Sequence, residues 1–385
     1  MTITFVSNFI NHHQIGVAEE IYSLTNGNFR FLETIPMPES FKKNGYPDFS
    51  RMPFVVRMWE DSRQEQEGNL LILNSDVVVC GGILSVRKLI RKRANKGLLT
   101  LIMGERWLKR GLKNVFSPNI FAEYVAYWIG GWSKKPVYRL CMSAYAANDV
   151  YSLYQYKGKC FKWGYFTKVD CRYEIEATNQ RESTSESIPL MWCARFLRWK
   201  HPELPVRLAA RLKAKGYNFV LDMFGSGEEL ENTKALIEKL GVGDCVILCG
   251  NRPNDGILKE MSQHKVFLFT SDRNEGWGAV LNEAMANGCV PVAADAIGSV
   301  PFLVEDGENG MIFKSEDIDS LEEKVTALLQ NKQLLSQMSE KAKKTMWLWS
   351  PKEAANRLVK LIEAIQAGKE NPFKYGPCSK AEPIR

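Results

Sequence analysis

The sequence is poor in histidine and lacks the cysteine spacings that are typical of metal sites. Only four histidines occur in 385 residues, and the nine cysteines are scattered without a Cys-x-x-Cys pair. Neither a zinc site nor a disulfide framework is therefore indicated, and buried thiols are the expected state of the cysteines.

Long apolar runs are absent as well. No run approaches the roughly 20 residues that a membrane span requires, and Met1 leads into the strand-like residues 3–6 without the basic region of a signal peptide. We expect a cytoplasmic protein, with a peripheral position at the inner face of the plasma membrane left open. With 45% hydrophobic residues, the 385-residue chain is long enough for two domains that each have a core.

Acidic residues are scarce in one part of the chain. Residues 1–188 contain 25 basic residues (Lys and Arg) and 18 acidic ones (Asp and Glu). Residues 189–385 contain 26 basic and 26 acidic residues. Ten basic residues and one acid, Glu105, lie between 87 and 113. We expect the segment 87–116 to contact anionic membrane headgroups, or else to be a solvated helix face. No nucleic-acid partner is expected, because no recognisable binding module accompanies the charge.

Strand-like and helix-like segments alternate along the chain, as in doubly wound parallel sheets. In the first half, predicted strands span 3–6, 30–34, 77–80, 98–102 and 137–140, and predicted helices span 14–25, 83–94, 119–130 and 143–154. In the second half, predicted strands span 189–195, 218–224, 245–249, 265–270 and 290–294, with helices between them.

The polar segment 171–188 contains few large apolar residues and is predicted to link two domains. The first domain would then span 1–170 and the second 189–350. The remaining residues, 351–385, are predicted to form a helix over 351–367 and a loosely ordered tail beyond Lys369.

The stretch 275–283 joins a predicted buried strand to a predicted helix and has a glutamate at each end. The apolar run 265–270 precedes it, and the helix formers of 282–286 close it. Backbone N–H groups at Gly276, at Gly278 and at the helix start should bind an anion, since the first turn of a helix has unsatisfied donors. A phosphorylated polyol is the expected ligand, although two glutamates at this spacing also occur by chance.

Four segments of the second half share a known pattern: Glu275-Gly276-Trp277-Gly278, Glu283-Ala284-Met285-Ala286, Gly288-Cys289-Val290-Pro291-Val292-Ala293 and Glu305-Asp306-Gly307-Glu308-Asn309-Gly310. They closely resemble the donor-site signature of retaining glycosyltransferases of family 4. The resemblance extends from Pro189 to roughly Ser350 and implies a GT-B fold: α/β, with two Rossmann-like doubly wound domains facing a central cleft. By analogy with GT-B proteins, the helix over 351–367 is expected to cross back to the first domain. Ser143-Ala144-Tyr145 and Lys162-Trp163-Gly164-Tyr165-Phe166 are similar to members from bacterial surface-polysaccharide synthesis.

The resemblance assigns a nucleotide diphosphate sugar, most simply a UDP-sugar, to the second domain. Arg195 and Lys200 would bind the donor diphosphate, although Ala194 and His201 replace the usual glycines there and Arg198 is a nearby competitor. The other donor-binding residues that it implies are Asn251 and Arg252 at the base, Glu275 at the sugar hydroxyls, Glu283 at the ribose, and the backbone of Gly276, Trp277, Gly278, Ala279, Val280 and Leu281. Gly225 opens a Gly-x-Gly turn after a predicted strand and is expected to lie at phosphate or base. Ser271 is expected to be a turn residue only.

The first domain should bind the acceptor, a glycan or lipid-linked glycan. In the loop after the first strand, Gly16 alone remains where many relatives have a pair of glycines, and His12 and His13 form an unusual pair. We favour acceptor or sugar contact for this pair over a structural role. Glu105 would position a hydroxyl beside Arg106, or else pair with it.

The reaction that follows from the resemblance is transfer of a sugar to a hydroxyl with retention at the anomeric carbon. The predicted catalytic residues are Glu275, Arg195, Lys200, Glu105 and His12. No Asp-x-Asp motif stands in a metal-binding loop, so no metal and no cofactor are expected. A sugar-nucleotide epimerase, a phosphorylase and a non-catalytic scaffold that binds nucleotide sugars are the alternatives.

Overall fold

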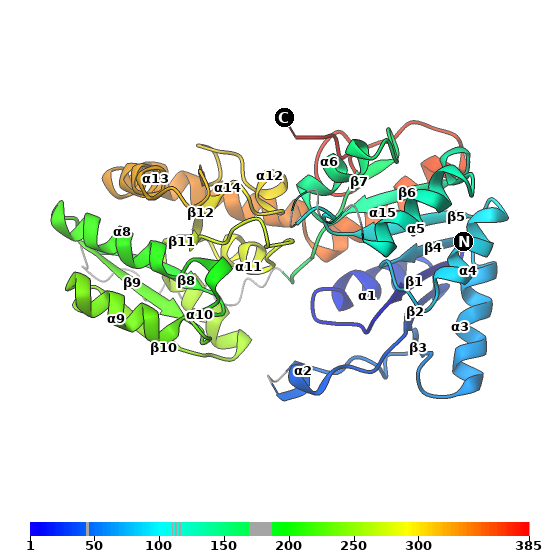
Figure 1. Cartoon of the computed structure of the whole chain (residues 1–385), viewed down its shortest axis with the longest axis horizontal. Coiled ribbons are helices and arrows are strands. Elements are labelled where there is room, and N and C mark those ends of the chain that lie inside the picture. The colour runs from blue at the N-terminus through cyan, green and yellow to red at the C-terminus, as the bar shows by residue number, and fades with distance from the viewer. Residues whose placement is uncertain (44–45, 110, 112–113, 115–116, 169–186, 385) are drawn as a thin grey trace. The chain divides into compact units, whose positions relative to one another are not determined.

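The computed structural model describes residues 1–43, 46–109, 111, 114, 117–168 and 187–384. The chain divides into two compact units (Figure 1). Unit 1 combines Met1–Lys168 with Leu348–Arg385, and unit 2 is the continuous segment Val169–Trp347. Each unit has a parallel β-sheet of its own.

Unit 1 is built on a seven-stranded parallel sheet with the order β3-β2-β1-β4-β5-β6-β7. Its strands are β1 (Ile3–Ser7), β2 (Phe29–Glu33), β3 (Val55–Arg57), β4 (Val77–Cys80), β5 (Leu99–Gly104), β6 (Val137–Cys141) and β7 (Cys160–Lys162). Its helices are α1 (Ile15–Leu24), α2 (Glu39–Lys43), α3 (Ser62–Asn74), α4 (Arg87–Asn95), α5 (Pro118–Trp128), α6 (Ala144–Ser152), α15 (Pro351–Gln366) and the 3-10 helix η2 (Trp132–Lys134).

Unit 2 is built on a six-stranded parallel sheet with the order β10-β9-β8-β11-β12-β13. Its strands are β8 (Ile188–Cys193), β9 (Phe219–Phe224), β10 (Val246–Gly250), β11 (Val266–Phe269), β12 (Val290–Ala294) and β13 (Met311–Phe313). Its helices are α8 (Glu203–Ala214), α9 (Leu230–Leu240), α10 (Asn254–Gln263), α11 (Val280–Ala286), α12 (Val300–Leu303), α13 (Ile318–Gln330), α14 (Lys332–Leu348) and the 3-10 helix η3 (Arg198–Lys200).

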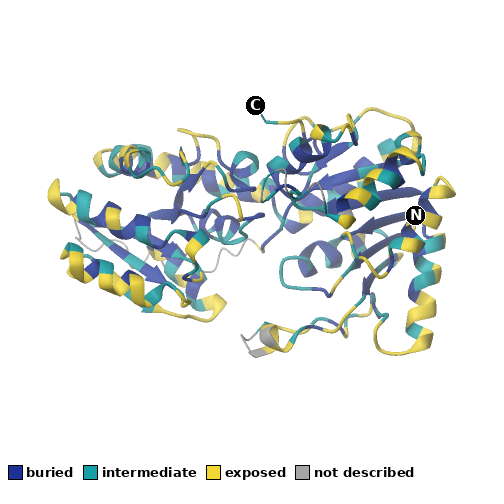
Figure 2. Cartoon of the chain, in the orientation of Figure 1, coloured by how far each residue is buried: buried dark blue, intermediate teal, exposed yellow. Residues whose placement is uncertain are grey.

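The central strands are apolar on both faces because helices cover both faces of a doubly wound sheet. Every residue of β4, β11 and β12 is buried, and Figure 2 shows the buried residues concentrated on the strands of both sheets. Polar side chains fix several helix starts: Asp61 accepts from the Gln64 N–H at α3, and Ser350 accepts from the Glu353 N–H at α15.

The α/β class with two doubly wound parallel sheets is confirmed. Each predicted strand and each predicted helix of the first half overlaps an observed one. Elements that were not predicted are the helices α2 and α3, the helices α12, α13 and α14 after the last predicted strand, and the three-residue strands β3, β7 and β13. Most of the predicted linker, residues 171–186, lies outside the described residues.

The prediction of a loosely ordered tail is wrong. Cys378, Ser379 and Ala381 are fully buried. The Cys378 N–H donates to Lys162 O at 2.8 Å, and the Ala381 N–H donates to Cys160 O at 3.0 Å, so the tail extends the edge at β7. The backbone bonds that β7 offers at this edge outweigh the polar composition of the tail.

The basic segment 87–116 is only partly exposed to solvent. Arg93 is buried and donates to four backbone carbonyls, the closest being Ser75 O at 2.6 Å. The exposed basic side chains are Lys88, Arg91, Lys92 and Lys96. Arg110 and Lys113 lie outside the described residues. Within the described part of the chain, no helix has the length and apolarity needed to cross a membrane.

Candidate functional site

The strand order of unit 2 reverses between β8 and β11, whose carboxyl ends therefore lie side by side. Ligands of doubly wound sheets bind at such a switch point. The loop after β8 carries Arg195 and Lys200, and the loop after β11 carries Glu275. The fold thus brings together two loops that the sequence analysis assigned to the donor.

A buried ion pair joins these two loops. Lys200 Nζ donates to Glu275 Oε2, and the side chains are 11% and 10% exposed. Ser271 Oγ donates to the same carboxylate oxygen at 3.1 Å, so Ser271 has a role beyond the turn that was predicted for it. The Asp272 N–H donates to Trp199 O at 3.0 Å and ties the two backbones together.

The loops after β8 and β9 are in direct backbone contact. The Phe196 N–H donates to Ser226 O at 2.9 Å. Gly225 has φ +130°, and a Cβ at this position would collide with Ala194 O. Gly225 is therefore required by the close approach of two backbones. Asn251, after β10, donates to Ser226 Oγ at 2.8 Å and joins a third loop to this edge.

Two predicted donor residues project from this edge. Arg195 and Arg252 are both exposed. Neither forms a side-chain hydrogen bond or an ion pair with another described residue. Arg195 can therefore bind an anion without first breaking an internal contact, in contrast to Lys200.

The turn 275–283 only partly fits the predicted anion site. Gly278 has φ +80°, and a Cβ there would collide with the Phe269 ring, so the turn requires glycine. The Leu281 N–H donates to Gly278 O at 3.0 Å and is therefore not available to a ligand. Trp277 is 1% exposed and its Nε1 donates to Asn282 Oδ1 at 2.9 Å, which places its ring in the core. Ala279 and Val280 are half-buried beside Gly278.

Glu283 lies within α11, as predicted. Burial raises the pKa of its carboxyl group to about 7. Burial, together with the charge of Glu283, raises the pKa of the Cys193 thiol to about 12. Cys193 is the last residue of β8, so the charge that acts on it places Glu283 near the carboxyl end of that strand. The Lys200–Glu275 pair lies at the same switch point.

In unit 1, the loop after β1 holds the histidine pair. The His12 and His13 rings lie 3.6 Å apart between centroids, and His12 stacks on Tyr46 at 4.7 Å. Burial lowers the pKa of His12 to about 4 and, with the adjacent His12, lowers that of His13 to about 3. Both Nδ1 atoms are buried without a hydrogen-bond partner among the described residues. Neutral rings near pH 7 suit contact with a sugar better than proton uptake.

Tyr165 connects the histidine pair to the end of β5. Its ring lies 5.2 Å from that of His13, and its hydroxyl donates to Glu105 Oε1 at 3.4 Å. Glu105 pairs with Lys109 at 2.5 Å. Arg106, which was the alternative partner of Glu105, instead lies 4.8 Å over the Tyr145 ring.

Gly16 has a packing role. It lies in α1, and a Cβ at this position would lie 2.9 Å from the Pro351 side chain at the start of α15. The absence of a side chain therefore lets these two helices pack closely.

A pocket of about 510 Å³ lies at the carboxyl edge of the unit 1 sheet. Glu105 and Arg106 line it, with Gly81 and Gly82 after β4. Its charged lining residues are Arg87, Glu105, Arg106, Lys109, Glu123 and Arg139. Four cations against two carboxylates favour an anionic ligand.

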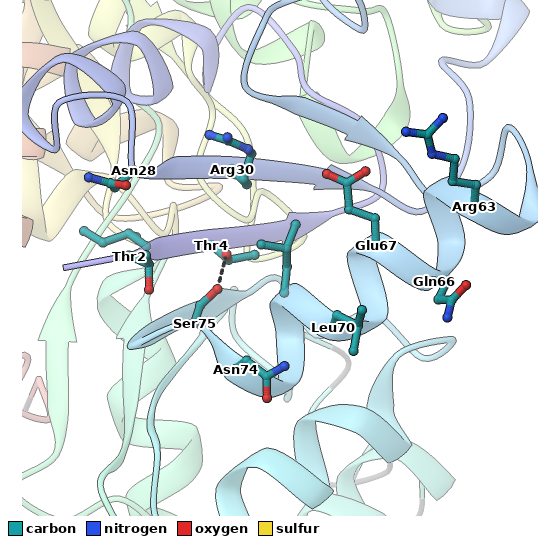
Figure 3. A pocket seen from close by; sticks show the side chains of 12 residues that line it. Thr2, Thr4, Asn28, Arg30, Arg63, Gln66, Glu67, Leu70, Asn74 and Ser75 are labelled. Atoms are coloured by element: carbon teal, nitrogen blue, oxygen red, sulfur yellow. Dashed lines mark hydrogen bonds between the residues drawn. The ribbon is translucent and has the colours of Figure 1, made fainter.

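A second pocket of about 580 Å³ lies at the opposite, amino-terminal edge of the same sheet (Figure 3). It is lined by the starts of β1 and β2 and by side chains of α3 that include Arg63 and Leu70. Thr4 and Ser75 hydrogen-bond to each other at 2.7 Å beside it. None of the predicted site residues lies there, and ligands of such sheets bind at the carboxyl edge.

Ser226, Tyr46 and Tyr165 were not predicted to take part in these arrangements, and Ser271 was predicted to be a turn residue only. The signals were weak: a serine or a tyrosine in a loop is common, and its partner is far away in the sequence. For Ser226, the position between two glycines of a Gly-x-Gly turn was the available indication.

Comparison with known proteins relates the second half of the chain to a family. Residues 176–345 match the family model Glycosyl transferases group 1. N-acetyl-alpha-D-glucosaminyl L-malate synthase of Bacillus anthracis is 28% identical over 165 residues, which are 43% of this chain and 42% of that protein. Poly(glycerol-phosphate) alpha-glucosyltransferase of Bacillus subtilis is 33% identical over 123 residues, which are 32% of this chain and 18% of that protein. The match covers less than half of either relative.

Solved structures match almost the whole chain. Sucrose-phosphate synthase of Thermosynechococcus elongatus gives a TM-score of 0.68 at 15% identity, over 96% of this chain and 100% of that chain. HepE of Anabaena, solved in complex with UDP, gives a TM-score of 0.65 at 14% identity. This match covers 95% of this chain and 100% of the HepE chain. These likenesses show a two-domain Rossmann-like α/β fold of the GT-B type. The family model alone relates residues 176–345 to Glycosyl transferases group 1.

Proposed function

We propose that this protein is a retaining glycosyltransferase of family 4. It would transfer a hexosyl group from a UDP-sugar to a hydroxyl of a glycan or lipid-linked glycan in the synthesis of a surface polysaccharide. The observation that carries this proposal is the Lys200–Glu275 pair at the switch point of unit 2, with Arg195 exposed on the same loop. The UDP bound in the structure of HepE and the polymer named for the Bacillus subtilis relative support it.

The chemical step would need stabilisation of the departing diphosphate. The bond from the anomeric carbon to the phosphate oxygen breaks, and a bond from that carbon to the acceptor oxygen forms on the same face. The acceptor's proton passes to the departing phosphate oxygen, so no side chain becomes covalently attached and no metal ion takes part. Arg195, Lys200 and the N–H groups at the turn before α11 would stabilise the negative charge that develops.

Glu275 and Glu283 would hold the uncharged parts of the donor. Glu275 is bound to Lys200 in the absence of a donor. When the diphosphate attracts Lys200, the carboxylate can accept from sugar hydroxyls. Glu283 would accept from the ribose hydroxyls, and Asn251 and Arg252 would contact the base.

The acceptor would bind in unit 1, at the pocket beside Glu105 and Arg106. The excess of cations around it suits an acceptor that carries phosphate, as a lipid-linked glycan does. His12 and His13 would contact the acceptor or the transferred sugar through uncharged rings. The exposed basic side chains of α4 would add a peripheral contact with anionic lipid and hold the protein at the cytoplasmic face of the membrane.

The first test is nucleotide release from uridine-, guanosine- and adenosine-diphosphate sugars, with chelator present and with or without a membrane-lipid extract. We expect release from a uridine donor, stimulated by the extract and insensitive to chelator. Isomerised sugar without transfer would indicate an epimerase, and dependence on inorganic phosphate would indicate a phosphorylase. Absence of both release and donor binding would leave the scaffold alternative and contradict the proposal.

Arg195→Ala tests the proposed site most cleanly, because Glu275→Ala would leave Lys200 buried and unpaired. Loss of one charged hydrogen bond to the diphosphate should lower kcat/KM by roughly ten- to a hundred-fold. Arg198→Ala is the matched control, since Arg198 is an exposed arginine on the same loop. Equal activity of Arg195→Ala and the wild type would contradict the role assigned to Arg195.

A further inference from the structure

Three loops at the carboxyl edge of the unit 2 sheet bring His201, Asp272 and Glu316 together. Each residue offers one ligand atom, and these atoms lie within 4.8 Å of one another. His201 follows η3, Asp272 follows β11 and Glu316 follows β13. The three residues come from separate parts of the sequence, so the fold alone assembles the cluster.

The His201 ring is oriented as a metal ligand would be. Its Nδ1 lies 2.8 Å from Glu203 Oε1, a geometry in which Nδ1 carries the proton and donates it to the carboxylate. Its Nε2 then has a free lone pair and lies 3.7 Å from Asp272 Oδ2. That Nε2 atom is buried and has no hydrogen-bond partner among the described residues. A carboxylate behind a histidine is the usual outer-shell arrangement of protein metal sites.

The carboxylates of the cluster lack ordinary counter-charges. Among the described residues, neither Glu203 nor Asp272 forms an ion pair with a lysine or an arginine. Both carboxylates instead face the His201 ring. Asp272 Oδ1 accepts from the N–H and the side-chain amide of Asn274, at 2.7 and 2.9 Å. These bonds hold the carboxylate in place. Three carboxylates around one imidazole favour a bound cation.

We propose that His201, Asp272 and Glu316 bind a divalent first-row transition metal ion, with Glu203 as the orienting outer-shell residue. One imidazole nitrogen with two carboxylates suits Zn²⁺ or Mn²⁺ and suits Mg²⁺ poorly, because Mg²⁺ prefers oxygen ligands. The site is additional to the proposed transferase reaction and takes no part in its chemical step.

The position of the ion gives it a structural role. His201 directly follows Lys200, and Asp272 lies three residues before Glu275. An ion shared by these loops would therefore hold in place the backbone on both sides of the Lys200–Glu275 pair.

The decisive experiment is a calorimetric titration of the purified full chain with ZnCl₂ at pH 7.5, after metal has been stripped and the chelator removed. We expect one equivalent that MgCl₂ does not displace. Glu316→Gln should abolish this binding, and because Glu316 is exposed the variant should remain folded. Glu203→Gln should weaken it roughly ten- to a hundred-fold. Glu323→Gln, an exposed position on α13, is the matched control and should bind as the wild type does.

A second readout separates this site from zinc bound elsewhere on the chain. Zinc should raise the melting temperature of the wild type and of Glu323→Gln but not that of Glu316→Gln. Equal zinc binding by all variants would overturn the proposal. Absence of zinc binding, with His201 titrating as an imidazolium, would overturn it as well. Neither readout uses a nucleotide sugar, so failure here is distinct from failure of the transferase assignment.

Discussion

Lys200 and Glu275 illustrate a general property of the proposed donor site. Both side chains are about nine-tenths buried, and desolvation of two charges largely cancels their attraction. Such a pair adds little to the stability of the fold but keeps both charges in place. An incoming diphosphate can then compete for Lys200 without having to order it, which fits a site that is organised before its ligand arrives.

Glu283 should make stability depend on pH. Burial raises its folded-state pKa from 4.5 to about 7, so between these values the folded protein binds more protons than the unfolded chain. Its contribution therefore falls as pH rises from about 4.5 to 7, by up to about 3 kcal/mol. Glu283→Gln removes this cost, and urea unfolding should show its stability relative to the wild type increasing across that range.

The control for this pH profile is Glu323→Gln at an exposed position of α13. It should follow the wild-type profile at every pH. If Glu283→Gln also ran parallel to the wild type from pH 5 to pH 8, the raised pKa assigned to Glu283 would be wrong.

Individual residues also show how far the sequence could predict the site. Lys200 and Glu275 follow strands that are recognisable by their apolar runs, so their position at the carboxyl edge could be predicted. Their pairing could not, because 75 residues separate them. Gly16 was predicted to contact the acceptor, and the structure adds its close approach to the Pro351 side chain. The prediction for Trp277 concerned its backbone alone. A short motif does not tell where the ring of such a residue lies, and the structure places it in the core.

At the scale of elements, long apolar strands were predictable and short edge strands were not. β3, β7 and β13 have three residues each, which is too few for a period of two to stand out. α3 escaped because its sequence, SRQEQEGNLLILN, is largely polar and buries only Gly68 and Ile72. The tail was misjudged for a related reason, since the backbone bonds that order it come from β7.

The tail should therefore respond to substitution as core does. Ala381→Asp would place a carboxylate without a partner at a fully buried position. We expect it to lower the free energy of unfolding by about 2–5 kcal/mol. Lys380→Asp introduces the same side chain at the neighbouring, exposed position. Thermal unfolding should show a large loss for Ala381→Asp and almost none for Lys380→Asp. Similar melting temperatures would mean that the tail is not packed on β7 in solution.

At the scale of the whole molecule, the two units differ in how the chain builds them. Unit 2 is one continuous segment, whereas unit 1 needs both ends of the chain. Its last part contributes α15, whose buried face includes Leu358, Leu361 and Ile362, and which packs on α1. Without that part, α1 would expose apolar surface and β7 would be left as an open sheet edge, which is a site of aggregation.

This difference predicts unequal behaviour of fragments. Residues 169–347 expressed alone should unfold cooperatively, because their sheet and its covering helices lie within the segment. Residues 1–168 alone should be insoluble or lack a cooperative transition, and co-expression with 348–385 should restore one. Calorimetry of each fragment beside the full chain would test this, with Ala381→Asp in the co-expressed segment as the control for specific docking. A cooperative transition of 1–168 alone would contradict the argument, because α15 and the tail would then be an addition to unit 1 and not a part of its core.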